Sequence, residues 1–116
     1  MRFEDLDVWK RSARLSAEVY KHFARAKDFG FKDQITRSSL SISSNIAEGF
    51  ERKSNKEFIN FLSYARGSSG ELRSQIYIGI EIQYIDSRLG KKWVSETEEI
   101  SRMLTGLMKA RAARLD

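Results

Sequence analysis

The stretch SSLSISSNIAEGFER, residues 38–52, combines the helical spacing of bulky apolar residues with an unusual density of serine. Ile42 and Ile46 lie on one face of a helix because residues four apart are neighbours there. Serine is a mediocre helix former, since its hydroxyl competes for backbone hydrogen-bonding groups. A helix with so few large side chains needs another source of stability. Close contact with a second helix provides one, because short side chains let two helix backbones approach each other.

Helical periodicity continues on both sides of this stretch. Gly30 and Gly49 predict the ends of the first and second helices. Ser54 and Glu57 have the spacing of a capping box, in which each side chain satisfies the other residue's backbone N–H, so the third helix begins there. The spacing predicts four helices, at residues 6–26, 31–49, 55–85 and 87–112.

The segment IYIGIEIQYI, residues 76–85, is ambiguous. Its alternating isoleucines are typical of a β-strand. No other stretch offers a partner strand, and a lone strand would leave its backbone groups unpaired. We therefore predict that it continues the third helix. The expected fold is all-α, a single-domain antiparallel up-down four-helix bundle over residues 1–116.

Composition limits the class of protein. A chain of 116 residues is long enough to bury a core. The absence of cysteine excludes a disulfide framework, a thiol nucleophile and a thiolate metal site. The N-terminal residues lack the apolar run of a signal peptide, and no stretch has the roughly 18 apolar residues of a membrane span. We expect a soluble cytoplasmic protein that does not bind membranes.

Two runs of small residues are expected to face each other. In an antiparallel pair of helices, a turn near residues 51–54 sets SSLS, residues 38–41, against ARGSSG, residues 65–70. Gly67 and Gly70 each cost the third helix up to about 1 kcal/mol relative to alanine. Close packing between the second and third helices would offset that cost.

A row of polar residues lies beside the Ile42 and Ile46 stripe. These side chains can form a network that joins the second and third helices, or they can face another subunit, a partner or a ligand; both interpretations stay open. The residues of this polar face are Arg37, Asn45, Glu48, Arg66 and Glu71, with Arg52 continuing the row.

The third helix is apolar on more sides than a four-helix bundle can cover. A helix that is apolar nearly all round is normally buried all round, so the surplus predicts a subunit interface. The alternative is scattered surface apolar residues, which are common. The interface residues are Ile59, Tyr64, Tyr77, Ile78, Ile82 and Tyr84.

The sequence holds few groups that could support catalysis. His22 is the single histidine, and Val19 stands where the Glu-x-x-His motif of a di-iron bundle would need glutamate. The segment GSSGE, residues 67–71, lacks the lysine of a phosphate-binding loop, and no His/Asp set accompanies any serine. We expect no enzyme, no metal, no cofactor and no small-molecule substrate.

Basic residues are better organised, in a chain of formal net charge +5. Stripes of this kind bind phosphates through counterion release without reading bases, although many are simply solvated. No aromatic residue is evidently interleaved with them, so we expect recognition of the backbone and shape of structured RNA or DNA, with RNA favoured. The predicted contacts are Lys10, Arg14, Lys21 and Arg25 on the first helix and Arg52, Lys53 and Lys56 before the third; Lys109, Arg111 and Arg114 end the fourth.

Three motifs carry a resemblance. FEDLDVW (3–9), QITRSSLSISSNIAEG (34–49) and ARGSSGEL (65–72) together resemble the bacterial four-helix-bundle family named after 23S rRNA intervening sequences. Many relatives have proline where this chain has Ser43. The resemblance spans residues 3 to about 110. Its signature positions fall on Gln34, Arg37, Ser41, Ile42, Asn45, Ile46, Ala47, Glu48 and Gly49, then on Gly67, Ser68, Glu71 and Leu72.

The resemblance implies a ring-like homo-oligomer, a homopentamer, that binds nucleic acid, because the family's genes lie within rRNA insertions. A similar fold serves as an accessory protein to reverse transcriptases in diversity-generating retroelements. Family membership predicts the fold better than the function. Two hypotheses remain: a non-enzymatic nucleic-acid-binding protein, or an oligomeric protein-interaction scaffold or accessory subunit.

Overall fold

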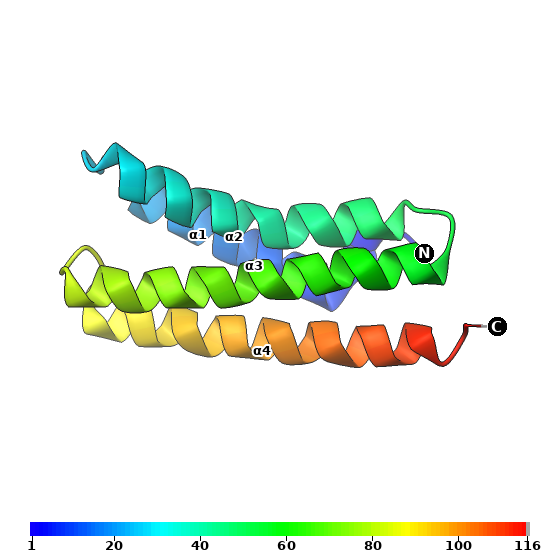
Figure 1. The fold of residues 1–116 in the computed structure, drawn as a ribbon. Coiled ribbons are helices and arrows are strands. Elements are labelled where there is room, and N and C mark those ends of the chain that lie inside the picture. Colours follow the sequence, from blue (N-terminus) through cyan, green and yellow to red (C-terminus); the bar gives the residue numbers. More distant parts are fainter. Residues whose placement is uncertain (116) are drawn as a thin grey trace.

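The computed structural model describes residues 1–115, and all regular structure in that range is helical. The chain runs four times along the long axis, turns back at each connection, and has both termini at one end (Figure 1). The predicted all-α four-helix class is confirmed. The elements are a 3-10 turn, η1 (Phe3–Asp5), and the helices α1 (Asp7–His22), α2 (Phe29–Phe50), α3 (Asn55–Glu81) and α4 (Ser87–Ala112).

The core runs along the bundle and takes side chains from every helix. Val19 of α1, Ile42 and Ile46 of α2, Leu72 of α3 and Ile100 of α4 are all fully buried. The stripe that contains Ile42 and Ile46 is therefore core, as its spacing predicts. Among the helix pairs, α3 packs most extensively, against α2 on one side and α4 on the other.

The third helix ends at Glu81 and not at residue 85. Gln83 adopts a left-handed backbone with φ of 66°. The N–H of Tyr84 then donates to the carbonyl of Gly79 at 2.8 Å, and the N–H of Gln83 donates to that of Ile80 at 3.0 Å. This pair of bonds is a Schellman motif, which satisfies the last carbonyls of a helix and stops it.

The first connection is longer than predicted. Helix α1 ends at His22 and not at residue 26, because the chain tightens and the N–H of Ala26 donates to the carbonyl of Phe23 at 3.0 Å. Helix α2 starts two residues before the predicted Phe31, since the Asp28 carboxylate accepts the Phe31 N–H at 3.1 Å. Such an N-cap satisfies a backbone donor that the helix leaves free.

The capping signal at Ser54 is half right. The Ser54 hydroxyl accepts the N–H of Glu57 at 3.2 Å and begins α3 at Asn55, as predicted. The Glu57 carboxylate, however, accepts the Ser54 hydroxyl at 3.2 Å and not the Ser54 backbone N–H. The predicted bounds of α4 match the structure at both ends.

Serine hydroxyls connect neighbouring helices. Ser68 donates to Ser41 at 2.9 Å, so the two small-residue runs of α2 and α3 face each other as predicted. The hydroxyls of Ser16 and Ser39 lie 3.2 Å apart between α1 and α2. Both groups of this second pair are buried, where an unpaired hydroxyl would be costly.

Hydrogen bonds of serine hydroxyls also join α3 to α4. The Ser69 hydroxyl donates to the carbonyl of Thr97 at 2.9 Å and accepts the Ser101 hydroxyl at 3.0 Å. Ser69 and Thr97 are fully buried. Serine therefore contributes polar contacts through the whole bundle and not only between the two helices that the sequence singles out.

Close packing occurs at other glycines than predicted. A Cβ added at Gly67 would meet nothing within 4 Å, and one at Gly70 would meet only the Arg73 side chain at 3.9 Å. A Cβ at Gly49 would lie 2.5 Å from the Cβ of Phe61. Gly49 is the next-to-last residue of α2, which ends at Phe50, one residue after the predicted stop, and it lets Phe61 of α3 approach.

An ion pair fastens α1 to α4. Arg11 donates two hydrogen bonds to the Glu96 carboxylate, at 2.9 Å and 2.6 Å. This bidentate geometry is the strongest arrangement of the two groups. The hydrogen bond from Arg11 lowers the pKa of Glu96 below its usual value, against an opposing effect of partial burial.

The glycine contacts predict opposite effects of the same substitution. Gly49→Ala should lower the free energy of unfolding by about 1–3 kcal/mol, because the new methyl overpacks the contact with Phe61. Gly67→Ala should raise it by up to about 1 kcal/mol, because alanine favours an exposed helix interior. Urea unfolding measures both. A Gly49→Ala variant as stable as the parent would show that the contact is not tight.

The Arg11–Glu96 pair predicts a pH-dependent stability. Near neutral pH, Glu96→Gln should lower the free energy of unfolding by about 1 kcal/mol, because the pair is partly exposed to solvent. A lowered pKa means that this stabilisation is present above the ordinary glutamate pKa of 4.5 and is lost as the pH falls through the folded-state value. Unfolding curves of parent and variant should therefore converge in acid. Glu98→Gln, at an exposed residue outside the pair, is the control and should change little at any pH.

Candidate nucleic-acid interface

Two of the predicted basic groups meet at one end of the bundle. The connection from α2 to α3 and the end of α4 lie together there (Figure 1). The Arg111 guanidinium donates to the side-chain oxygen of Asn55 at 3.2 Å and lies over the Phe58 ring, 5.1 Å from its centroid. A pocket of about 240 Å³ is lined by Phe50, Arg52, Lys53, Ser54, Asn55, Phe58 and Arg111. We call Arg52, Lys53, Lys56, Lys109 and Arg111 the basic end.

The cations of the basic end are not equally available. Arg52 donates to Glu48 at 2.9 Å, and its guanidinium also lies 3.9 Å from a carboxylate oxygen of Glu57. Lys53 and Lys56 are exposed, and neither forms an ion pair within residues 1–115. The charges of the two lysines therefore remain free for an anion, as does that of the exposed Lys109, whereas Arg52 is paired with carboxylates.

Aromatic rings lie among these cations, contrary to the sequence-based expectation. Arg52 sits over Phe61 with 4.7 Å to the ring centroid, and Arg111 sits over Phe58. The contact of Arg111 with Phe58 brings together residues far apart in sequence, whereas Arg52 and Phe61 lie nine residues apart across the start of α3. The only sequence signal is the pair of phenylalanines three residues apart, just after the basic turn.

The basic row on the first helix is exposed but interrupted. Lys10, Arg14 and Lys21 lie on α1, whereas Arg25 lies beyond its end, so the row is shorter than the predicted stripe. Arg14 lines a groove between α1 and α4 together with carboxylates and Lys92. Mixed charge makes this row a weaker candidate for phosphates than the basic end.

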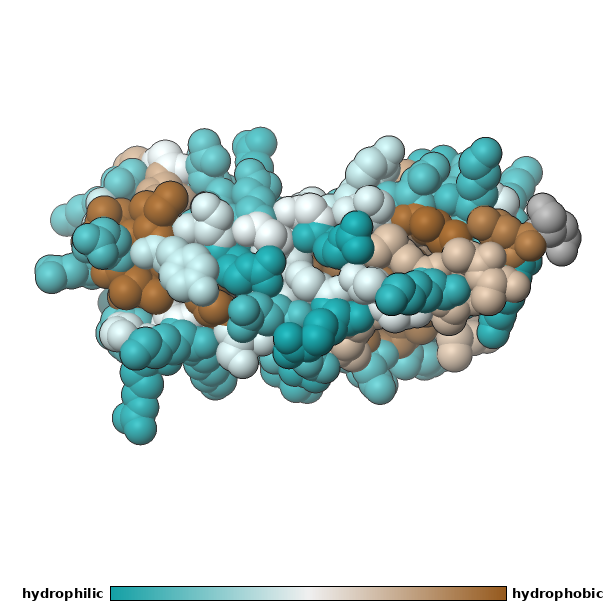
Figure 2. Space-filling view, turned by 60° about the horizontal axis from the view of Figure 1, so that its bottom comes forward, coloured by the Kyte–Doolittle hydropathy of each residue, from teal (hydrophilic) through white to brown (hydrophobic). Residues whose placement is uncertain are grey.

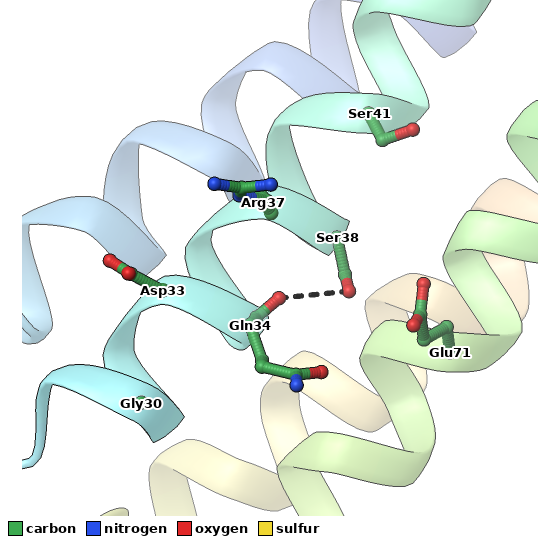
Figure 3. A pocket seen from close by; sticks show the side chains of 7 residues that line it. All are labelled: Gly30, Asp33, Gln34, Arg37, Ser38, Ser41 and Glu71. Atoms are coloured by element: carbon green, nitrogen blue, oxygen red, sulfur yellow. Dashed lines mark hydrogen bonds between the residues drawn. The ribbon is translucent and has the colours of Figure 1, made fainter.

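Part of the polar face borders a groove between α2 and α3. Figure 3 shows Gln34, Ser38 and Glu71 around the space between these helices, with Ser38 bonded to the Gln34 carbonyl at 3.0 Å. The groove has a volume of about 650 Å³ and carries both signs of charge. Its lining residues are Gly30, Asp33, Gln34, Arg37, Ser38, Ser41 and Glu71.

The rest of the polar face joins α2 to α3 only in part. Asn45 donates to the Ser41 carbonyl at 2.9 Å within α2, and Glu48 pairs with Arg52. Arg66 donates to the Thr105 hydroxyl of α4 at 3.1 Å. The predicted network between α2 and α3 is therefore present in part, because Arg52 links Glu48 to Glu57 at the start of α3. Asn45 also donates to the Ser41 hydroxyl at 3.0 Å, and that hydroxyl accepts from Ser68 of α3. Arg66 departs from the prediction by bonding to α4.

Large apolar side chains remain exposed on α3. Tyr64, Tyr77, Ile78 and Ile82 have exposed fractions of 58%, 56%, 51% and 44%, whereas Ile59 is half-buried. Figure 2 shows one hydrophobic region towards each end of the face in view. Within residues 1–115, none of the helices has the length and apolar character needed to cross a membrane.

Tyr84 differs from the other predicted interface residues. It lies in the connection after α3, its hydroxyl donates to the Asp28 carboxylate at 2.8 Å, and its carbonyl lies 2.9 Å from Nε2 of His22. The N–H of Phe31 and the Tyr84 hydroxyl lower the pKa of Asp28. Tyr84 and His22 thus fasten the first connection to the third.

Comparison with known proteins supports the fold and identifies the family of the chain. The crystal structure of a protein with unknown function from the S23 ribosomal protein family of Bacteroides thetaiotaomicron has a TM-score of 0.81 to this structure. The two chains share 27% identity, and the match covers 88% of this chain and 98% of that one. No curated protein matches the chain. The family model described as 23S rRNA-intervening sequence protein matches residues 4–106, and the chain belongs to that family.

Proposed function

We propose that this up-down bundle is a non-enzymatic nucleic-acid-binding protein that acts in the cytoplasm as a ring-like homo-oligomer, a pentamer. Its ligand is structured RNA, or less favourably DNA. The observation that carries the proposal is the meeting of two basic groups at one end, where Lys53 and Lys56 stay unpaired beside Arg111. Lysines that neutralise phosphates release condensed counterions, which favours binding whatever the base sequence.

An oligomer would strengthen such binding. One bundle offers only a few free cations, but copies arranged around an axis can engage several phosphates of one ligand at once. The exposed Tyr77, Ile78 and Ile82 form an apolar patch at the far end of α3, which suits a subunit contact. A contact there leaves the basic end of each copy open to its ligand.

A second candidate function is supported by the groove between α2 and α3. Asp33, Arg37 and Glu71 line it without forming ion pairs within residues 1–115. Free groups of both signs suit a protein partner with complementary charges, because such charges fix the orientation of a complex. In that case the protein is a scaffold or an accessory subunit, and its complex should withstand salt better than a phosphate contact does.

The nucleic-acid proposal predicts a strong effect of salt. Binding to a structured rRNA fragment should weaken steeply as salt rises, with a linear fall of log affinity against log salt. The double variant Lys53→Gln, Lys56→Gln should bind more weakly and reduce that slope by about 2, or about 1 for each lysine removed. Fluorescence anisotropy over a salt series measures both quantities.

The matched control is Lys27→Gln with Lys91→Gln, which removes the same charge from exposed residues at the opposite end. It should keep the slope of the parent. Equal losses in the two double variants would mean that net charge alone drives binding. No binding at low salt would refute the nucleic-acid proposal and leave the scaffold as the better explanation.

The apolar patch predicts a dependence of assembly on two residues. Tyr77→Glu combined with Ile78→Lys should give a folded monomer, since charges at a buried contact lose hydration without gaining partners. Light scattering gives the mass and circular dichroism gives the helix content. Ala17→Lys with Ser95→Glu, at exposed residues of α1 and α4, is the control and should leave the mass unchanged. An unchanged mass in the patch variant would contradict the proposed interface.

A further inference from the structure

One exposed aromatic residue lies next to the basic end and not in the distant apolar patch. Tyr64 projects from α3 with an exposed fraction of 58%, the largest of any tyrosine in the chain. Its hydroxyl makes no hydrogen bond within the part of the chain that the structure describes. Along the helix, Tyr64 follows Lys56 by eight residues, a rise of about 12 Å.

Tyr64 is supported by a rigid stack. Its ring meets Phe61 edge to face, with 5.5 Å between centroids and an angle of 82°. Phe61 is covered in turn by the Arg52 guanidinium and packs against Gly49. Arg52 is itself paired with Glu48 and Glu57, so the ring beneath Tyr64 has contacts on several sides. A ring fixed in this way loses little conformational entropy when a ligand stacks on it.

The helix surface beside Tyr64 is open. A side chain at position 67 would stand next to Tyr64, because residues three apart are neighbours on a helix. That residue is Gly67, and even an added Cβ there would meet nothing within 4 Å. A flat group can therefore approach the backbone of α3 next to the Tyr64 ring.

We propose that Tyr64 is a stacking site for an unpaired nucleobase of single-stranded RNA or DNA, whose flanking phosphates contact Lys53 and Lys56. The inference rests on the proposed nucleic-acid binding and adds a base contact to it. Every nucleobase has a π face, so stacking on an aromatic side chain tolerates any sequence.

The charges near Tyr64 favour a nucleobase over a second copy of the chain as the group that contacts this tyrosine. The lysines and Arg111 of the basic end attract a phosphodiester. The apolar patch formed by Tyr77, Ile78 and Ile82 lies near the other end of α3, away from Lys53 and Lys56. A nucleic acid with an unpaired segment therefore fits the surroundings of Tyr64 better than a subunit does.

The test uses two RNA hairpins, one blunt and one with a single-stranded extension that contains 2-aminopurine. Tyr64→Leu should weaken binding of the extended hairpin by roughly tenfold and leave the blunt hairpin and the salt slope unchanged. Tyr64→Phe keeps the ring and should bind like the parent. Aminopurine fluorescence should be quenched on binding to the parent and to Tyr64→Phe but not to Tyr64→Leu. Tyr20→Leu, at an exposed tyrosine of α1 towards the opposite end, is the matched control and should change neither affinity.

Each contrary result has a definite meaning. Equal affinity of Tyr64→Leu and the parent for the extended hairpin, or equal losses on both hairpins, would overturn the stacking site. So would a change in oligomer mass on light scattering, because Tyr64 would then be a subunit contact. If the lysine variant weakens binding and Tyr64→Leu does not, the stacking site fails while the proposed function stands. If the parent binds neither hairpin at low salt, both fail.

Discussion

The contact between α2 and α3 through small side chains is the constraint on which the other features depend. Ser41 and Ser68 meet at their hydroxyls, and Gly49 lets Phe61 approach the backbone of α2. Short side chains bring the two helix axes close, and a hydrogen-bonded pair costs little to desolvate. With α2 packed on one face, α3 presents a neighbouring face to α4, where Ser69 makes a similar contact with Thr97.

The alignment of α2 against α3 determines which residues lie at the ends of the bundle. The short connection at residues 51–54 must close between two helices that are already in contact, so its basic residues are held at the tip of the bundle. Near the end of α4, Arg111 donates a hydrogen bond to Asn55 at the start of α3. Basic residues from two distant segments therefore share one surface as a consequence of packing.

Arginine and lysine have different roles at the basic end. Arg52 and Arg111 lie over phenylalanine rings and make hydrogen bonds to protein side chains, so they organise the basic end. Planar guanidinium groups suit such contacts, whereas lysine is a compact, strongly hydrated charge. Lys53 and Lys56 remain in water, available to a ligand. The basic end, the groove between α2 and α3, and the apolar patch near the end of α3 are separate surfaces, so the proposed ligand and the proposed subunit contact would not compete for the same residues.

The sequence by itself determined the helical class, the core stripe through Ile42 and Ile46, the start of α3 at Ser54, and the facing of the two small-residue runs. These features follow from local periodicity, capping chemistry and the length of one turn. Only the tertiary structure decided that Gly49 and not Gly67 allows α3 to pack closely on α2, that Arg66 bonds to α4, and that Arg52 is paired with carboxylates while Lys53 is free. The physical reason is that a long side chain finds its partner according to the rotation and register of neighbouring helices, and the packing of the whole core sets both.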